Sequence, residues 1–247
     1  MRDVEIHLLV TPLELSGASL EVVGDAFRHL FRARRLASGQ RLRVVDGAGA
    51  ARWAVVEEVA RSTARLRLLE PAPSRDPAVG LELAVAVIRP ERAAWVVEKA
   101  TELGVRAVRF FPCARSQPFR DTAGHRLARV ASAALEQCGG ATLPNLAPLG
   151  SFEELVALAS ERRCVLLDAS GPPQVPAFAD RPASALLLVV GPEGGLVEGE
   201  VGRLHDAGAQ RLSLGPRTLR SETAALVGAA LLLQQELALR EGSSSPW

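Results

Sequence analysis

The chain has 247 residues, of which 48% are hydrophobic and 23% are charged, and its formal net charge is +1. This length fits one large domain or two small ones, and the apolar fraction is sufficient for a sizeable core. The near-neutral balance excludes a uniformly basic chain, although every basic residue other than Lys99 is an arginine. Because arginine binds phosphate in a fork-like manner, clusters of arginine merit separate inspection.

The cysteines and the N-terminal residues indicate the cellular compartment. Cys113, Cys138 and Cys164 form no C-x-x-C pair, which argues against a disulfide framework or a zinc site and favours a reducing cytosol. The N-terminal MRDVEIHLLV contains charges within its apolar run, so we expect neither a signal peptide nor a membrane span. These observations predict a cytoplasmic protein that needs neither metal nor membrane.

The spacing of apolar residues divides the chain into two parts. Up to residue 70 it is β-rich, with a strand, an Asp46-Gly47 turn and a strand over 41–59, and alternation over 63–70. A Pro-rich stretch at 71–80 indicates a boundary. Beyond it we expect strands at 81–88, 105–112, 164–168, 185–191 and 210–215, and helices at 91–103, 125–137, 152–163, 197–207 and 221–240. Apolar strands between helices predict an α/β fold with a parallel sheet.

Two Gly-Pro turns follow two of these strands. The first is GPEGG at 191–195, and the second lies in LSLGPRTLR at 212–220. Ligands of open α/β sheets bind beyond the carboxyl ends of the strands, and glycines let backbone groups approach them. We therefore expect both turns to contact one small ligand, although GPEGG alone also fits a tight turn without a ligand.

The second turn contains two arginines close to the start of the last helix. Cations at a helix N-terminus oppose the helix dipole, so Arg217 and Arg220 suggest a nearby anion. We expect Arg220 to face a nucleic-acid substrate. The alternative is a local salt bridge from Arg220 to Glu222 or Glu193.

Two further features point to partners. An arginine cluster without acidic residues between Ala26 and Val45 fits either phosphate contacts or a solvated face; it comprises Arg28, Arg32, Arg34, Arg35, Arg41 and Arg43. The last helix is apolar nearly all round. Such a helix is covered on several sides, either by a second subunit or within one large domain.

Four segments, in this order, resemble the bacterial small-subunit ribosomal RNA uridine-N3 methyltransferases of the SPOUT class. They are FRHLFRARRLASGQRLRVVDGAG, RPERAAWVVEKATELGVRAVRFF, LLVVGPEGGLVEGEV and LSLGPRTLRSETAAL. The resemblance implies a PUA-like RNA-binding β-barrel over 1–72, a linker over 73–80, a trefoil-knotted methyltransferase domain over 81–240 with helices on both faces of its sheet, and a tail over 241–247.

The resemblance also implies an activity: S-adenosylmethionine-dependent methylation of N3 of a uridine in 16S ribosomal RNA, by a homodimer joined through the knotted domain. Arg220 would stabilise negative charge on the uracil oxygens, and Glu193 would orient Arg220 or accept the proton. The implied cofactor-binding residues are Leu167, Gly191, Pro192, Gly194, Gly195, Leu196, Leu212, Leu214, Gly215, Leu219 and Thr223. The expected RNA-binding residues are Arg28, Arg32, Arg34, Arg35, Arg115 and Arg217.

The sequence departs from the family pattern at two positions. Gly140 stands where the family usually has an arginine, and Arg115 or Arg120 would replace that arginine. Gln40 stands where the family usually has an aspartate. Two other functions fit the same motifs. One is a SPOUT methyltransferase acting on another ribosomal or transfer RNA base, and the other is a non-catalytic RNA-binding assembly factor. A phosphate-loop enzyme fits poorly because neither turn is followed by the required lysine.

Overall fold

The computed structural model describes residues 6–118, 124–176 and 185–240. Its contacts divide the chain into two compact units. The first contains residues 1–76 together with 132–143, and the second contains residues 77–131 and 144–247. Each unit is described by itself below.

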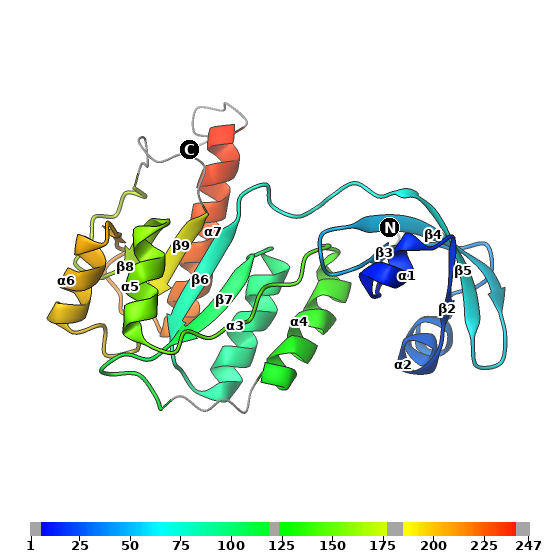
Figure 1. The fold of residues 1–247 in the computed structure, drawn as a ribbon, viewed down its shortest axis with the longest axis horizontal. Coiled ribbons are helices and arrows are strands. Elements are labelled where there is room, and N and C mark those ends of the chain that lie inside the picture. The colour runs from blue at the N-terminus through cyan, green and yellow to red at the C-terminus, as the bar shows by residue number, and fades with distance from the viewer. Residues whose placement is uncertain (1–5, 119–123, 177–184, 241–247) are drawn as a thin grey trace. The chain divides into compact units, whose positions relative to one another are not determined.

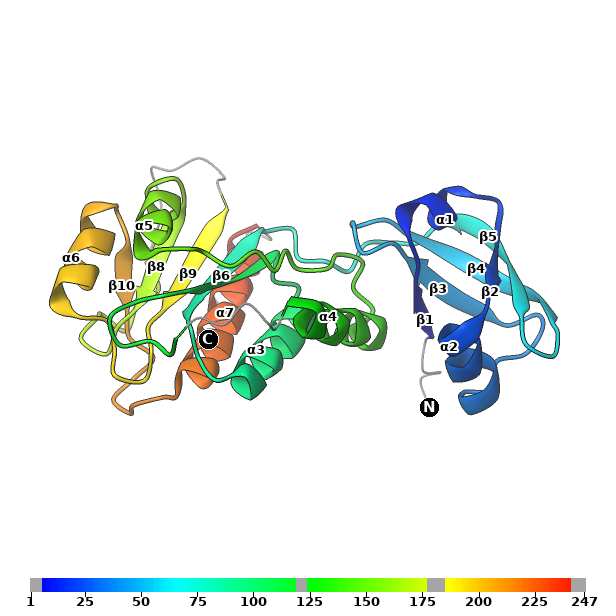
Figure 2. The same cartoon turned by 60° about the horizontal axis from the view of Figure 1, so that its bottom comes forward.

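The first unit is a five-stranded sheet in the order β1-β3-β4-β5-β2 (Figure 2). The strands are β1 (His7–Leu9), β2 (Ser19–Val22), β3 (Arg41–Val45), β4 (Ala51–Val59) and β5 (Ala64–Pro71). Two short helices, α1 (Pro12–Ser16) and α2 (Gly24–Phe27), and a π-helical turn, η1 (Arg28–Ala33), complete it. Strand β1 pairs with β3 in parallel and the other pairs are antiparallel.

The sheet curls around its own apolar core. Alternate residues of β3, β4 and β5, such as Leu42, Ala54 and Leu66, are fully buried in one cluster. Two register shifts between β4 and β5 bend the pair, as β-bulges do. The predicted hairpin over 41–59 and the strand over 63–70 are thus confirmed.

The second unit is a parallel sheet in the order β10-β8-β9-β6-β7 (Figure 1). The strands are β6 (Leu81–Ala86), β7 (Ala107–Phe111), β8 (Arg163–Leu167), β9 (Leu186–Val190) and β10 (Gln210–Leu212). The helices are α3 (Pro90–Glu102), α4 (Gly124–Cys138), α5 (Phe152–Ser160), α6 (Glu198–Asp206) and α7 (Ser221–Arg240). All four strand pairs are parallel, so the predicted α/β fold is confirmed.

Helices cover both faces of this sheet, as Figures 1 and 2 show. Helix α7 packs on β6 and β9 and against α3, whereas α5 packs on β8 and against α6. Strand β9 is buried at every position because it lies inside the sheet between these layers. The knot that the resemblance implies stays a prediction.

The end of α4 and the loop after it belong to the first unit, which the helical spacing of residues 125–137 does not indicate. Asp76 accepts hydrogen bonds from the Ala141 amide (2.9 Å) and the Thr142 hydroxyl (2.6 Å). Arg43 is 1% exposed and donates to the carbonyl oxygens of Gly139 and Pro73. The inclusion of Arg43 in an exposed basic cluster was therefore wrong, since its guanidinium is used inside this unit.

Candidate functional site

Three neighbouring strands end together at one edge of the parallel sheet. In the strand register Leu167 of β8 lies beside Val190 of β9 on one side and Leu212 of β10 on the other. The first turn (residues 191–196) follows β9, and the second turn (residues 213–220) follows β10. The topology therefore places both Gly-Pro turns at the carboxyl edge, where α/β sheets bind ligands.

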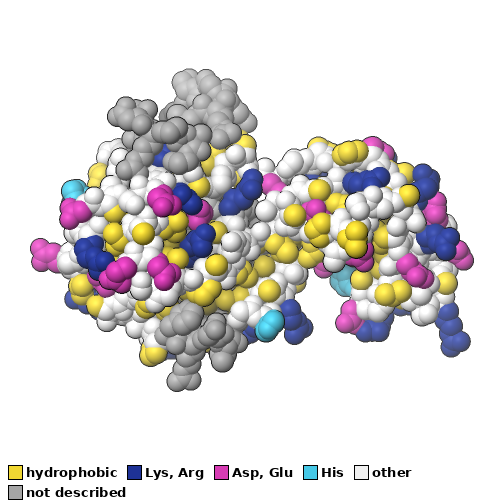
Figure 3. Space-filling model, viewed as in Figure 1, with side chains coloured by type: hydrophobic (Ala, Val, Ile, Leu, Met, Phe, Trp, Pro, Cys, Tyr) yellow, Lys and Arg dark blue, Asp and Glu magenta, His cyan; other side chains and the backbone are white. Residues whose placement is uncertain are grey.

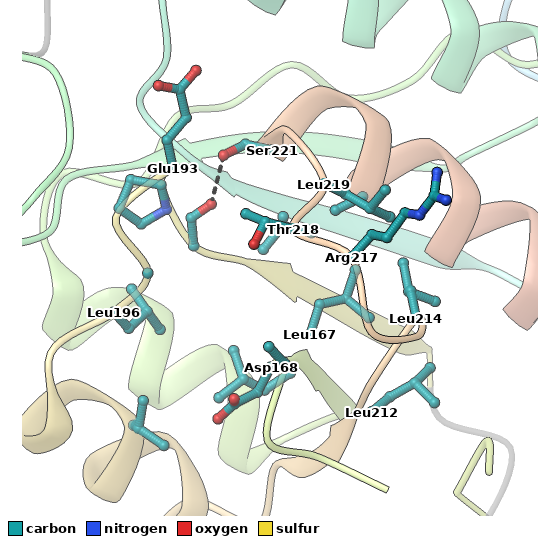
Figure 4. Close-up of a pocket in the computed structure, with 18 of the residues that line it drawn as sticks. Leu167, Asp168, Glu193, Leu196, Leu212, Leu214, Arg217, Thr218, Leu219 and Ser221 are labelled. Atoms are coloured by element: carbon teal, nitrogen blue, oxygen red, sulfur yellow. Dashed lines mark hydrogen bonds between the residues drawn. The ribbon is translucent and has the colours of Figure 1, made fainter. Parts of the chain in front are cut away.

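A cavity of about 300 Å³ lies between the two turns, at the lower end of the range for small-molecule sites. Figure 4 shows its wall, in which leucine side chains from the strand ends and the second turn surround backbone groups. The lining residues are Leu166, Leu167, Asp168, Ala169, Val190, Gly191, Pro192, Glu193, Gly195, Leu196, Val201, Leu212, Leu214, Gly215, Arg217, Thr218, Leu219, Ser221 and Ala224. The lining thus combines apolar side chains, most of them leucines, with the polar residues Asp168, Glu193, Arg217, Thr218 and Ser221.

The first residue of α7 joins the two turns. The Ser221 hydroxyl donates to the carbonyl oxygen of Gly191 over 3.0 Å, drawn as the dashed line in Figure 4. Ser221 is only 3% exposed, so water competes little for this bond. The bond fixes the start of α7, and with it the end of the second turn, to the first residue of the first turn.

Two glycines leave the backbone of the cavity open. Gly195 has a φ of 68° and Gly215 a φ of 108°, in the region that side chains with a Cβ rarely adopt. A Cβ at either position would meet no protein atom within 4 Å. The turns therefore need glycine for their conformation, and the space beside both residues is available to a ligand.

Most of the predicted cofactor-binding residues line this one cavity. Those that do are Leu167, Gly191, Pro192, Gly195, Leu196, Leu212, Leu214, Gly215 and Leu219. Gly194 and Thr223 are absent from the lining. Gly194 is at the exposed tip of the first turn, where its carbonyl oxygen accepts from Arg115 over 2.7 Å. Thr223 lies between Ser221 and Ala224, the two residues of α7 that do face the cavity.

Sequence reasoning missed Asp168, the carboxylate at the end of β8. Its Oδ1 accepts from the Ser170 amide and hydroxyl, each over 2.8 Å, and Oδ2 lies 3.7 Å from an Arg211 nitrogen. Asp168 follows a buried parallel strand directly, and this position was the signal that could have identified it. It places a mostly buried acceptor in the wall of the cavity.

The charges around the turns are paired in an unexpected way. Glu193 pairs with Arg92 of α3, and Oε1 of Glu222 lies 3.4 Å from Nε of the same arginine. Arg220 is exposed, and among the described residues it makes neither of the two salt bridges considered from the sequence. Its guanidinium is therefore free to meet a partner from solution.

The arginine cluster of the first unit divides into paired and unpaired members. Arg28 pairs with Asp25, and Arg32 donates to the Arg61 carbonyl and lies 5.5 Å from the Phe27 ring centroid. Arg34 and Arg35 are exposed and form no ion pair with any residue in the described ranges. Figure 3 shows basic and acidic side chains intermixed on one face of the protein. Within this cluster, Arg34 and Arg35, directly after η1, are therefore exposed cations that no described acidic residue pairs with.

Helix α7 leaves one apolar stripe uncovered. Val227, Leu231 and Leu237 are 46%, 39% and 47% exposed, and Trp95 on the neighbouring α3 is 42% exposed. The spacing of the three α7 residues puts them on one side of the helix, opposite Ala225, Ala229 and Leu232, which are buried. One side of this helix is thus covered within the unit, and cover of the other side by a second subunit stays a prediction.

Two negative findings concern the described ranges alone. No helix there is long and apolar enough to cross a lipid bilayer. No group of three or more His, Cys, Asp or Glu side chains in those ranges is placed to hold a metal ion.

Comparisons with known proteins place this geometry in a wider context. The model of an RNA methyltransferase domain matches residues 75–233, and the model of an RNA methyltransferase PUA domain matches residues 24–69. The chain is 32% identical to ribosomal RNA small subunit methyltransferase E of Mycobacterium bovis, over 91% of this chain and 89% of that protein.

Two solved structures share the fold along nearly the whole chain. A methyltransferase from Legionella pneumophila in complex with the cofactor S-adenosylmethionine is 28% identical, with a TM-score of 0.74 over 96% of this chain and 98% of that one. Ribosomal RNA small subunit methyltransferase E from Neisseria gonorrhoeae, 23% identical, has a TM-score of 0.82 over 94% of this chain and 98% of that one. The second likeness is one of fold.

Proposed function

The chain belongs to the ribosomal RNA small subunit methyltransferase E family, and from this premise we propose that it methylates N3 of a uridine in 16S ribosomal RNA with S-adenosylmethionine as the methyl donor. The observation on which the proposal chiefly rests is the cavity that both Gly-Pro turns line. It lies at the sheet edge where α/β enzymes bind small ligands.

The residues of the cavity suit this cofactor. Leucine side chains offer an apolar slot for an adenine ring, and the backbone of two glycine-containing turns offers hydrogen-bond partners. At Gly195 and Gly215 a side chain would project into space that no protein atom fills. We propose that Leu167, Gly191, Pro192, Gly195, Leu196, Leu212, Leu214, Gly215 and Leu219 bind the cofactor.

When bound, S-adenosylmethionine supplies an electrophilic methyl group on a sulfonium. The protein must position the pyrimidine and stabilise the charge that develops as N3 loses its proton. Arg220 is our candidate for the catalytic residue because it is exposed, stands between the cavity-lining residues Leu219 and Ser221, and has no ion-pair partner among the described residues. Arginine stays protonated, so it acts as a charge and hydrogen-bond donor and not as a base. Glu193 is the candidate proton acceptor from the sequence; it lines the cavity, but its carboxylate is paired with Arg92 and would have to leave this pair to accept the proton.

RNA would be held by both units. Arg34 and Arg35 offer unpaired cations in the first unit, with Arg28 and Arg32 beside them in the sequence. A non-glycine residue at positive φ, such as Arg35 at 57°, is often found at functional sites. Arg217 lies at the cavity and would contact the same substrate. Arg115 is a weaker candidate because its guanidinium already donates to Gly194.

We further propose that the apolar stripe of α7 is the dimer interface. Large exposed apolar side chains spaced along one helix mark a surface that is covered in the assembled protein. A homodimer through this stripe would join two methyltransferase units, and since its substrate is ribosomal RNA the enzyme would act in the cytoplasm.

In vitro methylation followed by nucleoside analysis tests the function. Small ribosomal subunits that lack the modification are incubated with the protein and labelled S-adenosylmethionine. We expect 3-methyluridine in the 16S ribosomal RNA and no product with deproteinised transfer RNA. A different methylated nucleoside would favour another base specificity. Absence of product together with absence of cofactor binding in calorimetry would favour an assembly factor without catalytic activity.

A further inference from the structure

Arg92, near the N-terminus of α3, contacts two segments that are far away in the sequence. One terminal nitrogen pairs with Oε1 of Glu193 in the first turn, and its Nε lies 3.4 Å from Oε1 of Glu222 in α7. Figure 4 shows the Glu193 side chain directed away from the leucines of the cavity. The guanidinium thus joins the outer side of the first turn to the helix that follows the second turn.

The contact with Glu222 matters because that carboxylate is buried. Glu222 is 8% exposed, and its Oε2 makes no hydrogen bond within the described parts of the chain. A buried carboxylate is costly unless a countercharge lies close by. Among the described residues, Arg92 is the only cation within 4.0 Å of it. The planar guanidinium presents several N–H groups along different edges, so one arginine can serve both carboxylates.

Arg92 and Ser221 therefore connect the same two segments, the first turn and the start of α7. The Ser221 hydroxyl binds the first residue of the first turn, Gly191, and Arg92 binds its third residue, Glu193. Both contacts lead to the first two residues of α7, Ser221 and Glu222. The cavity wall formed by the first turn is in this way fixed to the segment that ends in Arg220.

We propose that Arg92 is a positioning residue for the cofactor cavity: it holds the first turn against the start of α7 in the conformation that binds S-adenosylmethionine. This inference rests on the proposed function, since it assumes that the cavity binds this cofactor. It assigns Arg92 an effect on cofactor affinity, with none on the affinity for RNA.

The simpler role for Arg92 is general stabilisation through partly exposed ion pairs. The two roles differ in what they change in the folded protein. A stabilising residue lowers the melting temperature and leaves cofactor affinity unchanged well below it. A positioning residue lowers cofactor affinity at 25 °C in protein that is fully folded.

The test compares Arg92→Gln, Arg92→Lys and the matched control Arg106→Gln by calorimetry with S-adenosylmethionine. Arg106 is exposed and precedes β7, and its side chain makes no ion pair within the described ranges. Circular dichroism confirms that each variant is folded at 25 °C. We expect Arg92→Gln to weaken cofactor binding roughly five- to tenfold, the scale of losing one partly exposed charge network. Arg92→Lys should recover part of the loss, and Arg106→Gln should bind like the parent.

A double-mutant cycle makes the test specific. If Arg92 acts through Glu193, then Arg92→Gln combined with Glu193→Gln should bind the cofactor no more weakly than Arg92→Gln alone. Parent affinity in folded Arg92→Gln, or fully additive losses in the double variant, would overturn the inference. A parent protein that binds no S-adenosylmethionine would instead overturn the proposed function.

Discussion

The two Gly-Pro turns line the same cavity but are held in different ways. The first turn is held by side chains of other segments: Arg92 pairs with Glu193, Arg115 donates to the Gly194 carbonyl and Ser221 donates to the Gly191 carbonyl. The second turn has local hydrogen bonds between Ser213 and Gly215, and its outside contact is at its start, where the Ser213 amide donates to the Pro172 carbonyl oxygen.

This difference suggests a division of labour. Charges of the first turn are already used within the protein, so this turn serves as a wall of fixed shape. The second turn presents Arg217 and Arg220, both exposed and without an ion-pair partner among the described residues. Preorganised positive charge that is free of internal partners is what a site needs to stabilise an anionic transition state. We therefore expect changes in the first turn to act on the cofactor and changes in the second to act on catalysis.

The largest effect is expected at Arg220. Arg220→Ala should reduce methylation of small subunits by about two orders of magnitude or more, the loss typical of one transition-state donor. Its affinity for S-adenosylmethionine should stay within a few-fold of the parent, since Arg220 does not line the cavity. Single-turnover kinetics and calorimetry measure the two quantities. Near-parent turnover would show that Arg220 takes no part in the mechanism, and it would contradict the expected separation between cofactor binding by the first turn and catalysis by the second.

The next effect concerns α7, the helix into which the second turn continues. Leu231→Asp places a charge in the exposed apolar stripe and should weaken the proposed dimer by about 30-fold or more, because the charge would be buried without a partner. Light scattering across a dilution series measures the association. Gln210→Asp, at an exposed polar position of β10 outside α7, is a comparison for charge alone. A parent protein that is monomeric at all concentrations would refute the interface.

A smaller effect is expected in the first turn. Gly195→Val should weaken cofactor binding about tenfold or more, because a β-branched residue tolerates a positive φ poorly and would occupy the open side of the cavity. The control is Gly202→Val in α6, where a Cβ also meets no atom within 4 Å but φ is not positive. Calorimetry measures both. Unchanged affinity in Gly195→Val would mean that this turn is structural only.

The smallest effect lies in the first unit, remote in sequence from both turns. Arg34→Ala and Arg35→Ala should each weaken RNA binding by about threefold and reduce its salt dependence, as expected for single phosphate contacts. Filter binding over a range of salt concentrations measures this. Arg41→Ala serves as the comparison because Arg41 is already paired with Glu70. If all three variants bind RNA equally, the cluster is only a solvated face.

Much of the second unit could be predicted from the sequence, since its elements have strong periodic patterns. The five strands and five helices beyond residue 80 were placed within a few residues of their ends. The cavity could be predicted in outline, because strand-Gly-Pro patterns identify the edge at which ligands bind. These features depend on residues that are close together in the chain.

The parts that could not be predicted depend on distant residues. Arg92 and Glu193 lie 101 residues apart, and no local pattern indicates that they meet. Local reasoning offered Glu193 and Glu222 as alternative partners of Arg220, whereas the fold brings Arg92 to both of them. The attachment of residues 132–143 to the first unit has the same cause, since Asp76 and Arg43 reach that segment from earlier strands and loops.

The central claim is that both turns bind a single cofactor, and a crystal structure of the protein with S-adenosylhomocysteine tests it most directly. We predict the ligand between the two turns, with its adenine ring among Leu167, Leu196 and Leu214 and its polar groups on the backbone of the glycine-containing segments. A ligand bound elsewhere, or one in contact with a single turn only, would contradict the account.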